Sequence, residues 1–125
     1  MKKIISTTKA PKAVGPYSQA IEVNGTLYIS GQLPINPETS CFVEGGIKEQ
    51  TAQCLKNIEA ILSAAGYSVD NVVKSTVLLD NMNDFAAMNE VYAEFYTYNQ
   101  PARVAFEVAK LPLGALVEIE TVAAK

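Results

Sequence analysis

The chain has 125 residues, about the usual size of one compact domain, and 49% of them are hydrophobic against 18% charged. This composition excludes a disordered chain and supplies enough apolar surface for a core without metal or disulfide cross-links. The net charge of −3 argues against a dedicated nucleic-acid binder. The sequence contains no histidine, which excludes Ser-His-Asp and Cys-His nucleophiles and histidine-ligated zinc.

The two cysteines and the N-terminal residues bear on metal binding and location. Cys41 and Cys54 form no CxxC pair and have no further ligand candidates, so we expect no structural zinc. The first residues hold no apolar run long enough for a signal peptide, and no run in the chain approaches a bilayer-spanning length. We therefore expect a cytoplasmic protein with reduced thiols, no metal and no membrane association.

The first third of the chain is predicted to form a strand and a hairpin. Residues Lys3 to Lys9 are rich in β-branched side chains and predict an edge strand, which Ala10-Pro11 ends. The pair Asn24-Gly25 lies between two β-prone runs, 20–23 and 26–30, and this arrangement predicts a tight hairpin because both turn residues must accept positive φ.

A long loop and an amphipathic helix follow the hairpin. Residues 31–46 contain two prolines and end in a glycine pair, which predicts an extended loop. Apolar residues recur at helical spacing from Ile47 to Ala65, and Gly66 stands where a C-terminal cap belongs. Cys54 lies on the buried stripe of this helix, so we interpret it as a core residue rather than a reactive thiol.

The second half of the chain is predicted to alternate strands with one more helix. Val72 to Leu79 predicts a strand, and Ala102 to Ala109 and Leu116 to Ala123 predict the last two. Between the strand at 72–79 and the strand that begins at Ala102, the sequence predicts a helix with an aromatic stripe, which is typical of a core face. The members of that stripe are Phe85, Met88, Tyr92, Phe95 and Tyr96.

This order of elements predicts an α+β fold of one domain, residues 1–125. Antiparallel hairpins combined with helical crossovers imply a single mixed β-sheet with two helices packed on one face. No element then remains to cover the other face of the sheet. We therefore expect the chain to associate with copies of itself.

The strand from Ala102 carries the clearest candidate for chemistry. Strand alternation places Arg103, Ala105 and Glu107 on one face, and it places Glu118 and Glu120 together on one face of the last strand. In one interpretation, the planar guanidinium of Arg103 binds a carboxylate ligand through two parallel hydrogen bonds, and a strand glutamate accepts and donates protons. The alternative is an Arg–Glu ion pair on a solvated sheet face, which the pattern alone favours.

Four segments in register resemble the reactive-intermediate deaminase family, also called the Rid or YjgF family, along nearly the whole chain. The last of them runs from Pro101-Ala102-Arg103 through Leu111-Pro112 to Val117-Glu118-Ile119-Glu120. The other three are Gly15-Pro16-Tyr17-Ser18-Gln19-Ala20, preceded by Ala10-Pro11; Ile29-Ser30-Gly31-Gln32-Leu33-Pro34; and Asn83-Asp84-Phe85 with Asn89-Glu90-Val91-Tyr92.

The resemblance implies a chorismate-mutase-like fold, a homotrimer with ligand clefts between subunits, and hydrolysis of 2-imino acids to 2-oxo acids and ammonia without a cofactor. The 2-imino acids are those that dehydratases form from threonine and serine. By motif, Arg103 matches the carboxylate-binding arginine and Glu118 the glutamate that positions water. The matching positions that line the pocket are Tyr17, Ser30, Gly31 and Asn89.

One position departs from the family pattern. Members with this arginine usually carry cysteine two residues later, where this chain has Ala105. Thiol chemistry is therefore excluded there, although Ala105 keeps the backbone N–H that could bind a ligand.

Two other functions are compatible with the sequence. The first is a non-catalytic trimer that binds small carboxylates or regulates another protein, and it would need Arg103 but not Glu118. The second is the translation inhibition or ribonuclease activity attributed to some family members. The acidic balance, the lack of histidine and the lack of interleaved basic and aromatic residues argue against this second alternative.

Overall fold

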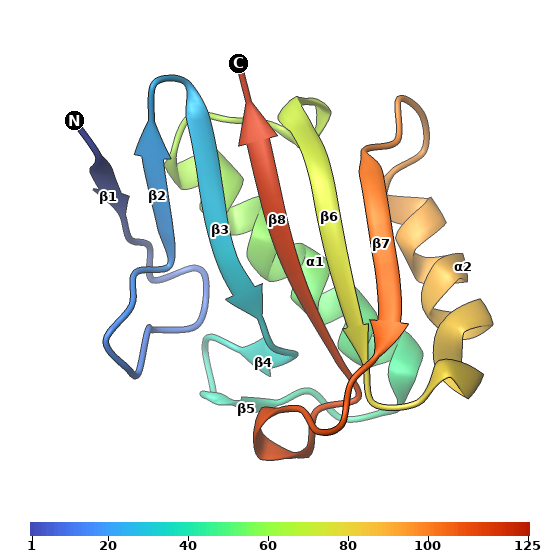
Figure 1. Cartoon of the computed structure of the whole chain (residues 1–125). Coiled ribbons are helices and arrows are strands. Elements are labelled where there is room, and N and C mark those ends of the chain that lie inside the picture. Colours follow the sequence, from blue (N-terminus) through green and yellow to red (C-terminus); the bar gives the residue numbers. More distant parts are fainter.

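The computed structural model describes all residues from Met1 to Lys125. Its centre is a six-stranded sheet of order β1-β2-β3-β8-β6-β7, in which β6 and β7 are parallel and the other neighbours antiparallel. The strands are β1 (Lys3–Ile5), β2 (Ala20–Val23), β3 (Thr26–Gln32), β6 (Val72–Leu79), β7 (Ala102–Glu107) and β8 (Val117–Ala124). Helices α1 (Ile47–Ala64) and α2 (Phe85–Phe95) lie on the same face of the sheet (Figure 1). The predicted α+β fold with one mixed sheet is confirmed.

The structure differs from the predicted elements at the end of the first strand and in the loop 31–46. The first strand ends at Ile5 rather than Lys9, because the N–H of Thr7 bonds to the side chain of Gln19 instead of to a strand. The predicted loop 31–46 begins inside β3 and contains a small two-stranded sheet. Its strands are β4 (Ile35–Asn36) and β5 (Cys41–Phe42). Three short 3₁₀ turns complete the chain: η1 (Val69–Asn71), η2 (Met82–Asp84) and η3 (Pro112–Gly114).

The hairpin of β2 and β3 follows the prediction. Asn24 and Gly25 have φ of 50° and 78°, the left-handed conformation that a tight two-residue turn requires. Leu27 and Ile29 are buried against α1, while Tyr28 between them is 51% exposed on the opposite face. The turn therefore fixes which side of β3 faces the core.

Helix α1 supplies the centre of the core. Its stripe of Leu55, Ile58, Ile61 and Leu62 is fully buried against the sheet. Cys54 belongs to the same stripe, is completely buried and approaches the Val117 carbonyl oxygen at 3.9 Å. This burial confirms that Cys54 is a core residue, and it raises the pKa of the thiol well above its usual value. Neither helix is long and apolar enough to cross a membrane.

The face of the sheet away from the helices is open and partly apolar. In β7, Ala105 pairs with the buried Val77 and packs toward the core, so Val104 and Phe106 point to the open face. These two side chains are 43% and 45% exposed. Large apolar side chains in this position are typical of a surface that another protein covers.

Candidate active site

Strand β7 holds Arg103 against helix α2. The Arg103 Nη1 donates a hydrogen bond to Asn89 Oδ1 at 2.6 Å. Its guanidinium carbon lies 4.7 Å from the ring centre of Tyr92 and 5.5 Å from that of Phe85, within the range of cation–π attraction. The side chain is nevertheless exposed, and no carboxylate pairs with it. Thus Arg103 does not form the Arg–Glu ion pair that its strand pattern allowed, and it keeps N–H groups for a ligand.

The backbone beside Arg103 is also open. Because β7 is the last strand of the sheet, one of its edges has no partner. The N–H of Val108 bonds to the Leu79 carbonyl, so by strand alternation the N–H of Ala105 points away from β6 toward that edge. The departure to alanine at this position leaves the N–H donor in place.

Glu118 and Gly31 form a second cluster on the other side of the sheet. The pairing of β3 with β8 shifts its register between Ile29 and Gln32, which brings Gly31 against the side chain of Glu118. A Cβ at position 31 would clash with Glu118 Oε2 and lie 3.0 Å from the carboxyl carbon of that residue. Glycine is therefore required here for the carboxylate to approach the backbone.

The environment of Glu118 disfavours its charge. Burial of the half-covered carboxyl raises its pKa, and the negative charge of Glu120 on the same face raises it further. No hydrogen bond within the chain offsets these two effects. A carboxylate with a raised pKa and no internal partner is suited to exchanging protons with a ligand or water.

Ser30 and Tyr17 border the Gly31 cluster. The Ser30 hydroxyl donates to the Ser18 carbonyl at 2.6 Å, so its proton is already engaged and its oxygen is available mainly as an acceptor. Tyr17 is 51% exposed. The loop before it is held by the buried side chain of Gln19, which exchanges hydrogen bonds with the backbone of Thr7, Ala10 and Pro11.

A single chain does not bring Arg103 and Glu118 together. Glu118 pairs with Leu78 and through it with Phe106, three residues along β7 from Arg103. Two strand spacings and three residues of rise separate the two Cα atoms by roughly 14 Å. Arg103 also points to the helix face, whereas Glu118 points to the open face. The predicted site residues therefore form two separate groups in one chain, which we call candidate half-sites: one around Arg103 with Asn89 and Ala105, and one around Glu118 with Gly31, Ser30 and Tyr17.

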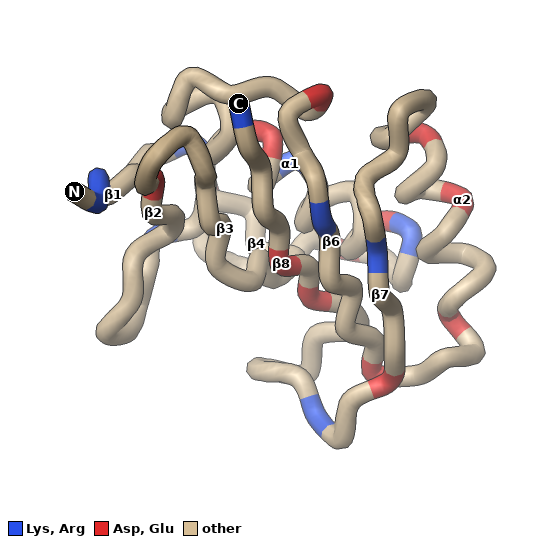
Figure 2. Tube along the Cα trace, turned by 45° about the horizontal axis from the view of Figure 1, so that its top comes forward, with Lys and Arg blue, Asp and Glu red and all other residues tan.

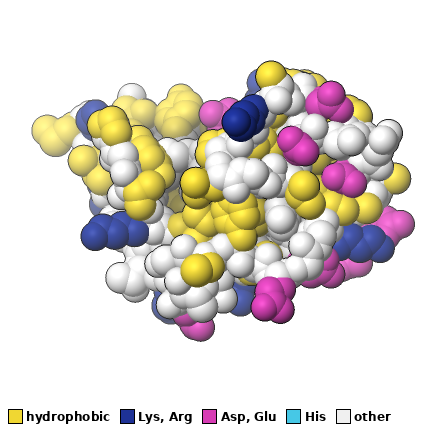
Figure 3. Space-filling view, turned by 90° about the horizontal axis from the view of Figure 1, so that it is seen from below, with side chains coloured by type: hydrophobic (Ala, Val, Ile, Leu, Met, Phe, Trp, Pro, Cys, Tyr) yellow, Lys and Arg dark blue, Asp and Glu magenta, His cyan; other side chains and the backbone are white.

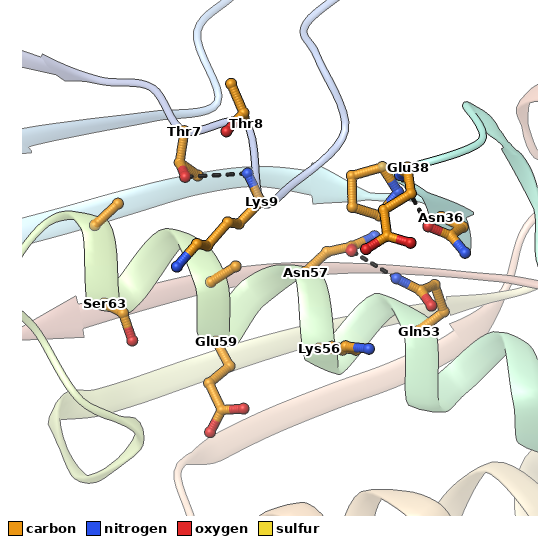
Figure 4. Close-up of a pocket in the computed structure, with 13 residues that line it drawn as sticks. Thr7, Thr8, Lys9, Asn36, Glu38, Gln53, Lys56, Asn57, Glu59 and Ser63 are labelled. Carbon is orange, nitrogen blue, oxygen red and sulfur yellow. Dashed lines mark hydrogen bonds between the residues drawn. The ribbon is translucent and has the colours of Figure 1, made fainter.

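The cavities of the molecule follow this division. One of about 400 Å³ adjoins Arg103 and Asn89, and one of about 140 Å³ adjoins Tyr17 and Gly31. The largest, about 770 Å³, lies elsewhere, between the outer face of α1 and the segments around residues 7–9 and 36–38 (Figure 4). Its lining is polar, with lysines and glutamates together, and contains none of the predicted site residues. No group of three or more acidic or cysteine side chains is placed to hold a metal ion.

Three residues near the half-sites are not among the site residues that the sequence predicts. Phe85 and Tyr92 pack in or against the core, as their stripe predicts, and both also stack on Arg103. Gln19 organises the loop before Tyr17. The spacing of Phe85, Asn89 and Tyr92, four and three residues apart, places them on one face of a helix. That spacing, together with the exposed partner Arg103, is the signal that could have found them.

Comparison with known proteins gives one consistent relationship. The family model described as Endoribonuclease L-PSP matches residues 7–125. The chain is 53% identical to the 2-iminobutanoate/2-iminopropanoate deaminase of Mus musculus over 123 residues, which cover 98% of this chain and 91% of the mouse protein. It superposes with a TM-score of 0.97 on YyfA of the Rid protein family from Yersinia pestis, with 50% identity and all of both chains covered.

A further solved structure, TdcF of E. coli with bound serine, superposes with a TM-score of 0.94 at 39% identity over 98% of both chains. The matches span the segments that carry Tyr17, Gly31, Arg103 and Glu118. The chain therefore belongs to the Endoribonuclease L-PSP family, the Rid or YjgF family whose motifs its sequence carries.

Proposed function

We propose that this protein hydrolyses 2-imino acids to 2-oxo acids and ammonia. Water adds to the imine carbon, and the C=N bond becomes a single bond as its nitrogen takes up a proton. The C–N bond then breaks, ammonia leaves and the C=O bond of the 2-oxo acid forms. The observation that carries the proposal is the Glu118 carboxyl, which is half-buried against Gly31, unbonded within the chain and raised in pKa.

The proposed active site forms between protomers of a homotrimer. The Arg103 half-site lies on the edge strand β7, and the apolar open face of the sheet lacks a cover within the chain. If the β7 edge of one protomer lies beside the Gly31 cluster of the next, the two half-sites face each other. Covering Val104 and Phe106 would contribute to the stability of that assembly. A stable monomer at micromolar concentration, measured by sedimentation or light scattering, would contradict this arrangement.

Each residue has a distinct task in the proposed reaction. Arg103, held by Asn89 and Tyr92, binds the substrate carboxylate through two parallel hydrogen bonds and thereby fixes the imine carbon. Glu118 of the adjoining protomer accepts a proton from the attacking water and returns one to the departing nitrogen. The Ala105 N–H adds a donor at the edge of β7. No step requires a cofactor, because the imine itself is reactive.

The names of the relatives support this function. The mouse relative is named for deamination of 2-iminobutanoate and 2-iminopropanoate, and TdcF holds serine, a ligand of the same size with a carboxylate. The description of the family model instead names an endoribonuclease. In this chain, basic and acidic residues are interspersed along the elements (Figure 2), an arrangement unlike the basic stripe of nucleic-acid binders.

The unpaired state of Cys41 and Cys54 supports a cytoplasmic location.

The experiment that tests the function compares Glu118→Gln with Glu120→Gln. The protein is added to a threonine dehydratase reaction, and the disappearance of the imine is followed. We expect Glu118→Gln to slow hydrolysis by roughly 10²–10⁴-fold, the usual contribution of an acid–base group, while 2-oxobutanoate still binds. Glu120→Gln, on the same face of β8, is the matched control and should retain most activity.

A binding protein without catalysis would give a different result. In that case the parent would bind 2-oxobutanoate, which titration calorimetry would detect, yet it would not accelerate loss of the imine. Parent-level hydrolysis by Glu118→Gln would likewise show that Glu118 does not carry the proton.

A further inference from the structure

Two strongly exposed apolar side chains face one small cavity beside Gly31. Val14 is 90% exposed and Leu113 is 80% exposed. They come from opposite ends of the chain, yet both line the cavity of about 140 Å³ that also reaches Tyr17 and Gly31. Figure 3, viewed from below, shows hydrophobic side chains gathered at the centre of this end of the molecule. A single exposed leucine is ordinary, but apolar residues that converge on a cavity are typical of a binding site.

The backbone of Leu113 is in an unusual conformation. Its φ of 57° and ψ of 20° lie in the left-handed region, which L-residues other than glycine and asparagine rarely adopt. Burial of the side chain within the chain does not compensate for this strain, because Leu113 remains exposed. Backbone strain of this kind clusters at active sites and ligand-binding segments. The turn η3 thus holds an apolar side chain toward the cavity at the expense of local stability.

The position of the cavity relative to Glu118 identifies its occupant. Gly31 lines the cavity and also lies against the Glu118 carboxyl. In the proposed function, which this inference presupposes, the carboxylate of the 2-imino acid lies at Arg103 and its C=N group at Glu118. The remaining substituent of the same carbon is the apolar side chain, and the apolar space beside Glu118 is this cavity. We propose that Val14 and Leu113 form the side-chain subsite and determine which 2-imino acids the enzyme prefers.

The volume of the cavity predicts the direction of that preference. A buried apolar cavity of about 150 Å³ accommodates benzene, so about 140 Å³ exceeds the ethyl group of 2-iminobutanoate. Each additional buried methylene improves affinity about fourfold. The larger product analogue 4-methyl-2-oxopentanoate has two carbons more than 2-oxobutanoate. We therefore expect it to bind about 15-fold more tightly.

Titration calorimetry with these two 2-oxo acids tests the subsite without depending on turnover. Leu113→Asn keeps a residue that accepts the left-handed conformation and removes the apolar wall. We expect the preference for the larger ligand to fall from about 15-fold to about fourfold or less, with 2-oxobutanoate affinity changed less than about threefold. Val14→Ser should reduce the preference in the same direction, and Leu113→Met should retain it.

The control is Ile4→Asn, which removes an exposed aliphatic side chain of the same size on the far edge of the sheet, at β1. It should leave both affinities unchanged. If the parent has no preference, or if Leu113→Asn and Val14→Ser keep the parental preference while 2-oxobutanoate still binds, the subsite is wrong and the proposed function stands. If neither 2-oxo acid binds to the parent, the proposed function fails together with the subsite.

Discussion

Replacing Arg103 by alanine removes the group that the structure leaves free for a carboxylate. The side chain makes one hydrogen bond, to Asn89, and is exposed, so its loss costs little folding stability. Two hydrogen bonds to a charged ligand contribute roughly 1.5–3 kcal/mol each. At about 1.4 kcal/mol for each tenfold change, Arg103→Ala should weaken binding of 2-oxobutanoate by at least about a hundredfold.

Titration calorimetry measures this loss directly, and Asn89→Ala is the matched comparison. Asn89 orients the guanidinium, but the rings of Tyr92 and Phe85 remain stacked on it in the variant. We therefore expect Asn89→Ala to weaken binding by about tenfold, the contribution of a single hydrogen bond to a charged group. If Arg103→Ala binds 2-oxobutanoate within about fivefold of the parent while remaining folded, the carboxylate is not held by Arg103 and the reasoning is refuted.

Three further changes follow from the Gly31–Glu118 cluster and the buried thiol. Gly31→Ala should reduce turnover about as much as Glu118→Gln while changing the melting temperature little, because the new Cβ displaces the side-chain carboxylate of Glu118 and no backbone atom. Full activity of Gly31→Ala would contradict this. Glu118→Gln should raise the melting temperature at pH 7–8. A carboxyl whose folded pKa is raised destabilises the fold progressively as pH rises above the ordinary glutamate value, about 4.3, and most strongly above the folded pKa. The gain in melting temperature should therefore vanish as pH falls below about 4.3. Cys41→Ser with Cys54→Ala should keep its turnover and lose about 0.5–1.5 kcal/mol of unfolding free energy, as for removal of one buried heavy atom.

The elements that sequence predicts best are those with strong local signals. Asn24-Gly25 is typical of one kind of tight turn, and the apolar stripe of α1 defines the single face of that helix that is buried. The predicted bounds of the hairpin turn and of α1 therefore agree with the structure to within a residue or two. The predicted end of β1 is wrong because the true end depends on Gln19, a side chain distant in sequence that forms hydrogen bonds with the backbone of Thr7. Such a tertiary contact has no local signature.

The candidate site shows a comparable division. Arg103 and Glu118 stand out by motif, but period-two alternation alone does not state which face of a strand the helices cover. The apolar residues Val104 and Phe106 could equally have faced the core. The structure places them outward, because Ala105 pairs with the buried Val77 and packs against the core. Arg103, on the same face as Ala105, contacts Asn89 and Tyr92 of α2. Its position depends on contacts with Asn89, Tyr92 and Phe85 of α2, which the residues of β7 alone do not determine.

The separation of the half-sites supports one further test, in which two inactive variants restore each other. In a trimer, each proposed site takes Arg103 from one protomer and Glu118 from a neighbour. Protomers carrying Arg103→Ala and Glu118→Gln, unfolded together and refolded as a mixture, place an intact Arg103 beside an intact Glu118 at about a quarter of the interfaces. Imine hydrolysis should then recover to about a quarter of the parent rate, with each variant refolded alone as the control. If both residues act within one protomer, every site in the mixture lacks one of them, and no activity returns.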